Sequence, residues 1–504
     1  GRADATPGDA AADIGARPGR ADAADAEARK LALAYLAQRA YVLYFGVTQP
    51  GALRALLERA AGWWPDAAWR LQLDVVRMQL ATHTGEFAAA LERSAAALAD
   101  PALDCGTRRH LEPLHAANLF FAGRCVESVE RSSRPEVPLR GVADQIAFAV
   151  WLGNRLQTGV GWDELHAVLP GALADAVRAG DHGGAGLAAL GLGTLAFAEG
   201  RLLDAERWLD ESDFQLERRD AMHVLPITLA LRAGVEVLLG HPDRAGEVRE
   251  RLRGRLAVRP PLPTHGPYVE HAEAALSSDR AAAARALLAA ADEHAGMAPL
   301  AAQLAYQALL LGASPARVAA RLRGAATGSP AAGVASRPHA DTGSAHAASA
   351  APGPLAPTGL DSPLVAAYRL HADGLVAHDG QRLLQAADAF EAIGAAYFAQ
   401  LASVDAARAF VAAGREDSAR RAAARARSLH VPDQGGAAPL VDGLGGVAVQ
   451  LTAREAQLSE LAARGLSNAQ IAERLVLSVR TVESHVYRAM QKLGVNDRHD
   501  LPLR

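Results

Sequence analysis

The chain has 504 residues, of which half are hydrophobic and only 5% are aromatic, and its formal net charge at pH 7 is −4. This length exceeds what one hydrophobic core can serve and predicts about three domains of ~150 residues each. The charge excludes a general nucleic-acid coat protein, and no run of ~18 apolar residues indicates a membrane span. The only two cysteines, Cys105 and Cys125, make no disulfide framework, so we expect a cytoplasmic protein.

The N-terminal part divides into a lead and a repetitive region. Residues 1–29 lack the apolar core of a signal peptide and are predicted to be disordered. Residues 30–323 are rich in the helix formers alanine, leucine, arginine and glutamate and contain an internal repeat. In each copy an apolar helical stretch ends at a glycine and a second stretch follows it. These glycines, which lie 38, 38, 39 and 40 residues apart, are Gly85, Gly123, Gly161, Gly200 and Gly240.

The repeat predicts stacked helical hairpins. Glycine can end a helix because it adopts the left-handed conformation at low cost. A small residue often follows five positions later, where it lets the next helix pack closely: Ala90, Ser128, Ala205 and Ala245. The pattern resembles a tetratricopeptide-like array, although its period is longer than the about 34 residues of that family. The alternative is an alanine-rich helical domain with glycine turns.

Two segments of different composition follow. Residues 324–361 are rich in Gly, Ser, Ala and Pro without periodicity and are predicted to be a flexible linker, in which histidines are solvated rather than metal-bound. Residues 362–430 return to helical hairpins, with Gly380 and Gly414 34 residues apart. A basic face on the last of these helices is interpreted as solvated surface. Residues 431–446 are predicted to be a second linker.

Motifs of catalysis and cofactor binding are missing. The stretch "GLGTLA" (Gly191–Ala196) fits a glycine-rich dinucleotide fingerprint, but the residues before it are helical in pattern, so we expect packing glycines. The sequence contains no G-x-x-x-x-G-K-[ST], H-E-x-x-H or G-x-S-x-G. We therefore expect neither an enzyme nor a bound cofactor or metal.

Residues 447–504 predict three short helices in a helix-turn-helix arrangement. Thr452 and Glu455 form the pattern of a capping box, and Gly465 ends the first helix. Ser467 or Asn468 caps the second helix, and Ser478 caps the third after a short apolar turn. In such a unit the second helix braces the third, whose outer face can enter a major groove of DNA.

The third helix has two distinct faces. Its apolar face is predicted to consist of Val479, Val482, Val486, Met490 and Leu493, and its outer face of Arg480, Thr481, Ser484, Tyr487, Arg488, Gln491 and Lys492. From Leu451 onward the chain carries eight Lys or Arg and six Asp or Glu, so it is the one part biased toward phosphates. The alternative is an ordinary trihelical packing unit with a polar face.

This segment resembles the LuxR-type (GerE-type) DNA-binding domain along its entire length. The matching residues are Leu451, Thr452, Arg454, Glu455, Gly465, Ser467, Asn468, Ile471, Ala472, Leu475, Ser478, Arg480, Thr481, Val482, His485, Lys492, Leu493, Gly494, Val495 and Arg498. The resemblance implies an all-α transcription regulator, in which a tetratricopeptide-like helical-hairpin array precedes a small C-terminal helix-turn-helix domain.

The resemblance also implies roles for individual residues. The base-reading positions of the family fall on Glu483, Ser484, Tyr487 and Arg488. Phosphate positioning falls on Asn468, Arg480, Thr481 and Lys492. The sequence departs from helix-turn-helix units at Val476, where glycine is common, so we expect the turn either to avoid a left-handed residue there or to bear strain.

The whole chain resembles the large MalT-like regulators, which join an ATPase module, helical repeats and this terminal domain. No P-loop ATPase module is found here. The expected partners are double-stranded DNA, RNA polymerase, a second copy of the chain, and an effector or protein on the repeats. Dimerisation stays open because the family's fourth helix is reduced to "DRHDLPLR". Two rivals stay open as well: a fragment of a signal-transduction ATPase regulator, and a protein-interaction scaffold.

Overall fold

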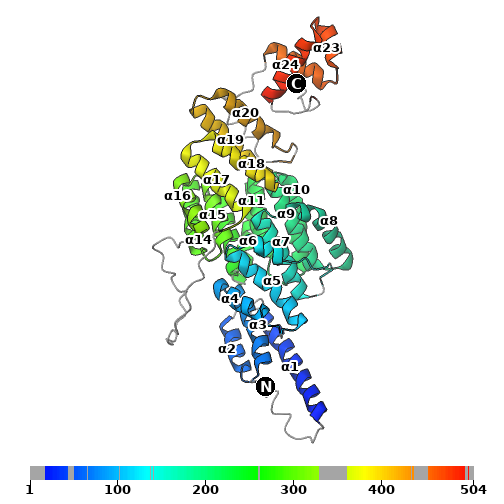
Figure 1. The fold of residues 1–504 in the computed structure, drawn as a ribbon, viewed down its shortest axis with the longest axis vertical. Helices are drawn as coiled ribbons and strands as arrows, with labels where there is room; N and C mark the ends of the chain where they lie inside the picture. Colours follow the sequence, from blue (N-terminus) through cyan, green and yellow to red (C-terminus); the bar gives the residue numbers. More distant parts are fainter. Residues whose placement is uncertain are drawn as a thin grey trace.

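A computed structural model describes residues 18–43, 50–64, 66–101, 103–136, 138–139, 141–258, 262–327, 360–432, 434–435, 452–493 and 498. The described residues form helices and no strands (Figure 1), which confirms the all-α fold class. The α-helices before the first gap of more than ten residues are α1 (Pro18–Tyr41), α2 (Pro50–Ala60), α3 (Ala67–His83), α4 (Phe87–Leu98), α5 (Cys105–Phe121), α6 (Cys125–Arg131), α7 (Val142–Thr158), α8 (Trp162–Ala179), α9 (His182–Ala198), α10 (Leu202–Arg218), α11 (Leu225–Leu239), α12 (Pro242–Val258), α13 (Gly266–Ala275), α14 (Arg280–Glu293), α15 (Ala298–Leu310) and α16 (Pro315–Thr327). The α-helices after it are α17 (Pro363–Ala377), α18 (Gly380–Ile393), α19 (Ala396–Ala412), α20 (Glu416–Ser428), α22 (Ala453–Ala463), α23 (Asn468–Leu475) and α24 (Val479–Leu493).

Two predicted boundaries differ from the structure. Residues 18–29, which we expected to be disordered, are the first half of α1, and Arg29 in this helix bonds both Asp25 and Asp66. At the other boundary, α16 continues to Thr327, into the segment predicted to be a linker. Most of the two predicted linkers lies outside the described residues.

The helices from α3 to α17 form stacked hairpins. Except between α12 and α13, each helix packs against the next one in the chain, and every odd-numbered helix in this range also packs against the following odd-numbered helix. This neighbour pattern produces the long array of Figure 1, with α1 to α3 at one end and α17 to α20 toward the other. Stacking of consecutive hairpins is the arrangement that the glycine repeat predicts.

Four of the five repeat glycines end an odd-numbered helix in the left-handed conformation. Their φ angles are +86° at Gly85, +86° at Gly123, +80° at Gly200 and +80° at Gly240. The small residues that follow them, among them Ala205 and Ala245, are fully buried. Gly161 differs, because the left-handed glycine that follows α7 is Gly159 and Gly161 directly precedes α8. The later pair is also shifted: Gly414 is left-handed, whereas Gly380 begins α18 and the left-handed residue before it is His378.

Helix α9 lies at the centre of the array, and nearly all of its residues are buried. Its glycines allow the neighbouring helices to approach closely, because a β-carbon at Gly191 would lie 2.8 Å from leucine side chains of α7 and α8. A β-carbon at Gly193 would lie 2.8 Å from Leu209 of α10. The glycines of "GLGTLA" therefore serve helix packing, as predicted.

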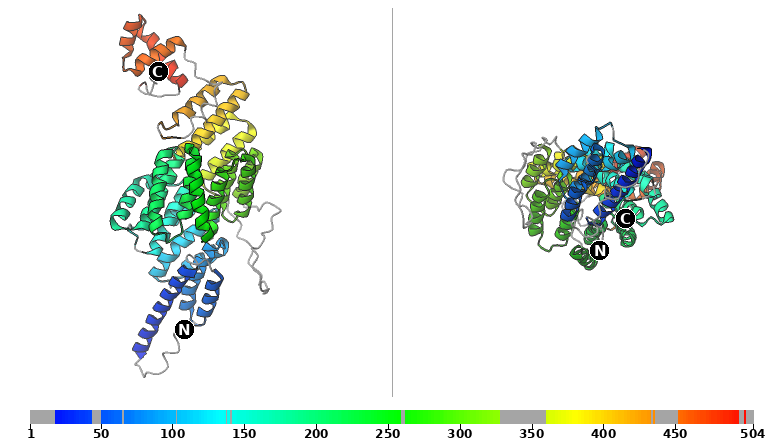
Figure 2. Two further views of the ribbon diagram at one scale, coloured as in Figure 1. Left: turned by 180° about the vertical axis from the view of Figure 1, so that it is seen from behind. Right: turned by 90° about the horizontal axis from the view of Figure 1, so that it is seen from below.

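The array curls so that its later helices pack back onto its earlier ones. Helix α15 contacts α5 and α7, α17 contacts α7, and α19 contacts α9. Figure 2 shows from behind that the yellow later helices adjoin the green middle of the array. Aromatic rings fill the junction: Phe197 lies 5.7 Å from Tyr397, and Tyr306 stacks on Tyr368 at 4.0 Å between ring centroids. The curl brings together helices that are far apart in the sequence.

Candidate nucleic-acid interface

Each of the three C-terminal helices is capped at its N-terminus by a side chain. Thr452 Oγ1 accepts the Glu455 N–H of α22, and the Glu455 carboxylate accepts the Thr452 N–H at 2.8 Å. Ser467 forms the same reciprocal box with Gln470 at the start of α23. Ser478 Oγ accepts the Thr481 N–H at 3.1 Å and caps α24. These contacts are short-range, which explains why the sequence predicts where the helices begin.

The three helices enclose a core of their own. Its buried members are Leu458, Ala462, Ile471, Ala472, Val482 and Val486. Ala489 is also fully buried, although the sequence did not indicate it. Val479 was predicted on this apolar face, but 43% of its surface is exposed. It is the first residue of α24, next to the turn, and its exposure shows that this assignment is wrong.

The turn between α23 and α24 contains a valine whose backbone adopts the left-handed conformation. Val476 ends α23 with φ 55° and ψ 51°, and its side chain is 91% exposed. Left-handed backbone is costly for a β-branched residue, and here no burial of the side chain offsets the cost. Of the two outcomes that the sequence left open, the turn bears the strain.

Two arginines of the domain stabilise it from within. Arg498 donates to the Leu466 carbonyl at 2.6 Å and to Asn468 Oδ1 at 3.1 Å, which fixes the loop before α23. Arg454 donates to the Leu475 carbonyl at the end of the same helix. The sequence singled out both residues as family matches but gave them no role, since only the fold shows what they contact.

The predicted base-reading residues share the outer face of α24. Glu483, Ser484, Tyr487 and Arg488 are all exposed, opposite the buried Val482 and Val486. Tyr487 is the most prominent apolar group there, with 62% of its surface exposed. Within the described part of the chain, Arg488 forms no ion pair. Its guanidinium is therefore available to an outside acceptor, and guanine is the base that arginine binds in a bidentate way.

Three of the four predicted phosphate-positioning residues lie at two helix N-termini. Asn468 is the first residue of α23 and Arg480 the second of α24. Asn468 uses its oxygen to hold Arg498, which leaves its amide N–H groups as donors. Thr481 is less free, because its hydroxyl lies 2.7 Å from Ser478 Oγ within the cap. The side chain of Lys492 lies outside the described residues. Helix N-termini bind phosphates well, since their first N–H groups point outward.

The geometry agrees with a sequence comparison. Residues 449–503 match the family model described as bacterial regulatory proteins, luxR family.

The C-terminal domain is a LuxR-type helix-turn-helix. It gives the chain the DNA-binding domain of a LuxR-type transcription regulator, as the sequence predicted. No curated protein matches the chain significantly.

The His485 side chain of the LuxR-type domain packs against the domain and does not project into solvent. It is half-buried, and its Nδ1 has no hydrogen-bond partner among the described residues. The sequence left open whether this histidine packs or contacts a phosphate. Its burial on the side between Val482 and Val486 places the ring against the domain core, so we assign it no DNA contact.

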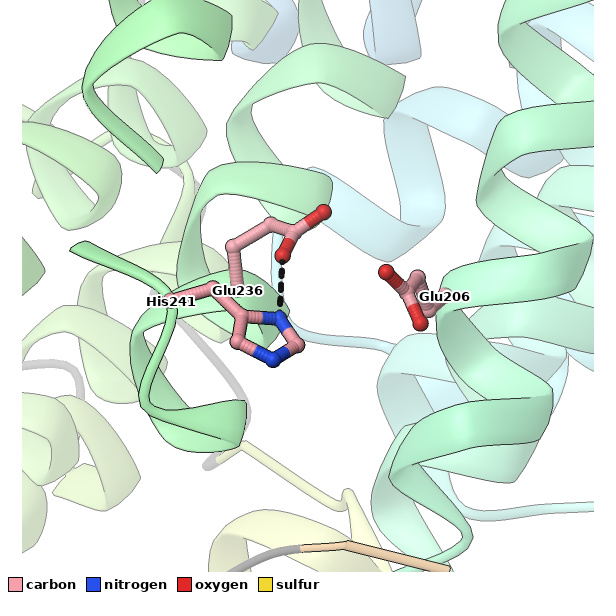
Figure 3. A group of neighbouring side chains, drawn as sticks. All are labelled: Glu206, Glu236 and His241. Atoms are coloured by element: carbon pink, nitrogen blue, oxygen red, sulfur yellow. Dashed lines mark hydrogen bonds and ion pairs between the residues drawn. The ribbon is translucent and has the colours of Figure 1, made fainter. Parts of the chain in front are cut away.

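Outside the LuxR-type domain, the described residues contain one group of three potential metal ligands (Figure 3). Atoms of Glu206, Glu236 and His241 lie within 4.8 Å of one another. Arg244 already neutralises Glu206 at 2.9 Å, and the His241 ring bonds the buried Glu236 at 3.0 Å. The second oxygen of Glu236 lacks a hydrogen-bond partner in the described part of the chain. These two pairs account for the cluster, and we assign no metal to it.

None of the described helices is long and apolar enough to cross a membrane.

Proposed function

We propose that this chain is a transcription regulator that binds a promoter-proximal DNA site through α24 and receives its signal on the helical array. The observation that carries the proposal is the outer face of α24. Its polar side chains are exposed, while the opposite face of the same helix is buried in the apolar core of the domain. If this domain served only for packing, an exposed tyrosine between Glu483 and Arg488, on the face that points away from the core, would have no function.

The proposed roles follow from the positions of the side chains. Arg488 donates to guanine, Glu483 accepts from the amino group of cytosine, and Ser484 and Tyr487 complete the contacts in the groove. Arg480, Asn468, Thr481 and Lys492 bind phosphates and set the register of α24.

The helical array supplies the regulatory part of the proposal. Stacked hairpins offer large surfaces for partners, and a DNA-binding domain needs an input that changes its activity. The family resemblance adds RNA polymerase and a second copy of the chain as partners, in the cytoplasm.

Salt-dependent DNA binding by the full chain tests this function. The anisotropy of a labelled random duplex should report binding whose log–log salt slope is several units, at ~0.9 per phosphate contact. Arg480→Ala should lower the slope by about one unit. Arg178→Ala removes an exposed arginine of α8 and is the matched control, which should leave the slope unchanged. Binding that stays flat from low to moderate salt would favour a protein-interaction scaffold.

A further inference from the structure

The curl of the array encloses a cavity of about 750 Å³. Its walls come from α9, α11 and α13 on one side and from α15, α17 and α19 on the other. Small-molecule sites in proteins measure roughly 300–1,000 Å³. The cavity therefore has the size of a ligand site, and it exists because the late helices of the array pack back onto the early ones.

Most of the wall is apolar. Phe197, Leu231, Leu304, Tyr397 and Leu401 contribute from four different helices. The hydroxyl of a further aromatic residue in the wall, Tyr268, already accepts the Gln157 amide at 2.8 Å. An apolar surface of this kind favours a ligand that is itself mostly hydrocarbon.

The charged groups of the wall are already engaged. Asp405 pairs with Arg408 at 3.1 Å and with the His371 ring at 3.1 Å. Arg280 donates to the Leu310 carbonyl at 3.1 Å. A charged ligand would have to displace one of these contacts to gain a counterion, so the wall favours an uncharged one.

Three uncharged polar side chains of the wall are not engaged. Gln303 and Gln307 lie one turn apart on α15, and neither amide has a hydrogen-bond partner in the described part of the chain. His271, on the adjacent α13, has a buried Nδ1 that likewise lacks one. Burial lowers the pKa of His271 to about 4, so its ring is neutral at pH 7. Gln307 is buried and Gln303 is half-buried. Polar groups inside a protein are normally satisfied, and a ligand with a polar group would offer these a partner.

The cavity also touches the segment that leads toward the DNA-binding domain. Leu429, Val431 and Gly435 line it. Gln434, between them, accepts the Leu203 N–H with its backbone oxygen at 3.0 Å and the Asp204 N–H with its side chain at 3.2 Å. A molecule in the cavity would therefore contact both the array and Leu429, Val431 and Gly435 of this segment.

We propose that this cavity is the effector site of the array, that it takes an uncharged, largely apolar small molecule with one hydrogen-bonding group, and that residues 429–435 transmit its occupancy to the LuxR-type domain. The inference rests on the proposed function for its last step only. The ligand class follows from the wall: apolar surface for the body of the molecule, and His271, Gln303 and Gln307 for its polar group.

Binding of Nile red, an uncharged apolar dye, to the full chain tests the site. Gly234→Leu should fill the cavity from α11, because a β-carbon there has room, with His271 Nε2 as its nearest neighbour at 3.8 Å. We expect saturable binding by the wild type and a loss on the order of tenfold or more in Gly234→Leu. Gly246→Leu on α12, where a β-carbon would meet nothing within 4 Å and which lies outside the wall, is the matched control and should bind as the wild type does.

Competition against the dye tests the ligand class. 1-Decanol should displace Nile red at a concentration about tenfold lower than decanoate, which carries a charge that the wall does not complement. Gln307→Leu should weaken decanol and leave the fold intact, since it replaces a buried amide by an apolar group of similar size. The proposal is overturned if Gly234→Leu binds the dye like the wild type while remaining folded by circular dichroism, or if decanoate competes better than decanol.

The last step is tested by DNA binding with and without 1-decanol. Saturating decanol should change the DNA affinity of the wild type by about 5–150-fold, the usual range of coupling between sites, and should not affect Gly234→Leu. If the dye and decanol do not bind but DNA binding persists, the effector site is wrong and the DNA-binding function stands. If DNA binding itself is absent, the proposed function fails regardless of the dye. Decanol that binds without changing DNA affinity refutes the transmission step.

Discussion

The backbone oxygen of Gln434 accepts the N–H of Leu203 at 3.0 Å, so the segment that follows α20 is attached to the start of α10. The side chain of Gln434 adds a second bond, to the Asp204 N–H. Gly435 next to it lies against Leu239 of α11. The residues that lead from the array toward the DNA-binding domain are thus fixed to two helices that line the cavity.

This attachment predicts a variant that separates binding from transmission. Gln434→Ala removes the side-chain bond to Asp204 and leaves the backbone bond to Leu203. Nile red should bind as tightly as in the wild type, whereas the effect of decanol on DNA affinity should fall by about half, because one of the two bonds is lost. An unchanged decanol effect would show that the segment does not transmit the signal.

The left-handed valine in the turn predicts a stabilising substitution. Val476→Gly removes the strain of a β-branched residue at positive φ and should raise the free energy of unfolding of residues 447–504 by about 1 kcal/mol, after the entropic cost of glycine. Val479→Gly, an exposed valine in helical conformation three positions later, is the control and should lower it by about 0.5–1 kcal/mol. Urea unfolding measures both; destabilisation by Val476→Gly would mean that the turn is not strained.

The close crossing of α9 and α10 predicts an overpacking variant. Ala205 is fully buried, and its carbonyl would lie 3.4 Å from a β-carbon at Gly193 on the facing helix. Ala205→Leu should therefore cost roughly 1–3 kcal/mol. Ala281→Leu at an exposed position of α14 is the matched control and should be nearly neutral. Full tolerance of leucine at position 205 in thermal unfolding would contradict the stacked hairpins.

Two histidines whose pKa is lowered in the folded chain predict how stability depends on pH. Burial lowers the pKa of both His115 and His271 to about 4, below the ordinary value of 6.5. Below pH 6.5 the unfolded chain takes up protons that the folded chain does not, so stability is full above pH 6.5 and is lost as the pH falls toward 4. Each histidine should cost up to about 2 kcal/mol at pH 5. The His115→Gln/His271→Gln double variant should show a smaller drop in the urea midpoint between pH 7.5 and pH 5; an equal drop would exclude these groups as the cause.

The sequence predicted those features that depend on neighbouring residues. The caps at Thr452, Ser467 and Ser478 follow from contacts over three positions, and the left-handed glycines end helices for local reasons. It did not predict the curl, because the packing of Phe197 on Tyr397 joins distant helices whose hydrophobic patterns fit several partners. For the same reason the cavity and the wall residue His271 could not be found before the structure.

Within the LuxR-type domain, the limits of prediction had a similar origin. Helical periodicity placed Val482 and Val486 correctly but also Val479, because periodicity does not show where the neighbouring helices end. The roles of Arg454 and Arg498 needed the fold, since their acceptors are carbonyls that the sequence pattern does not mark. The base-reading and phosphate-positioning roles stay predictions.

Selection of preferred sites from random duplex DNA tests the central claim most directly, namely that α24 reads bases with its outer face. Arg488→Ala and Glu483→Ala should each change the preference at one base pair, by about 1–3 kcal/mol, because each loses a direct base contact. Lys492→Ala should weaken binding to all sequences alike and lower the salt slope by about one unit. The account predicts altered site preferences for the first two variants and the wild-type preference for the third. If Arg488→Ala keeps the wild-type preference while Lys492→Ala changes it, the assignment of reading and positioning on α24 is wrong.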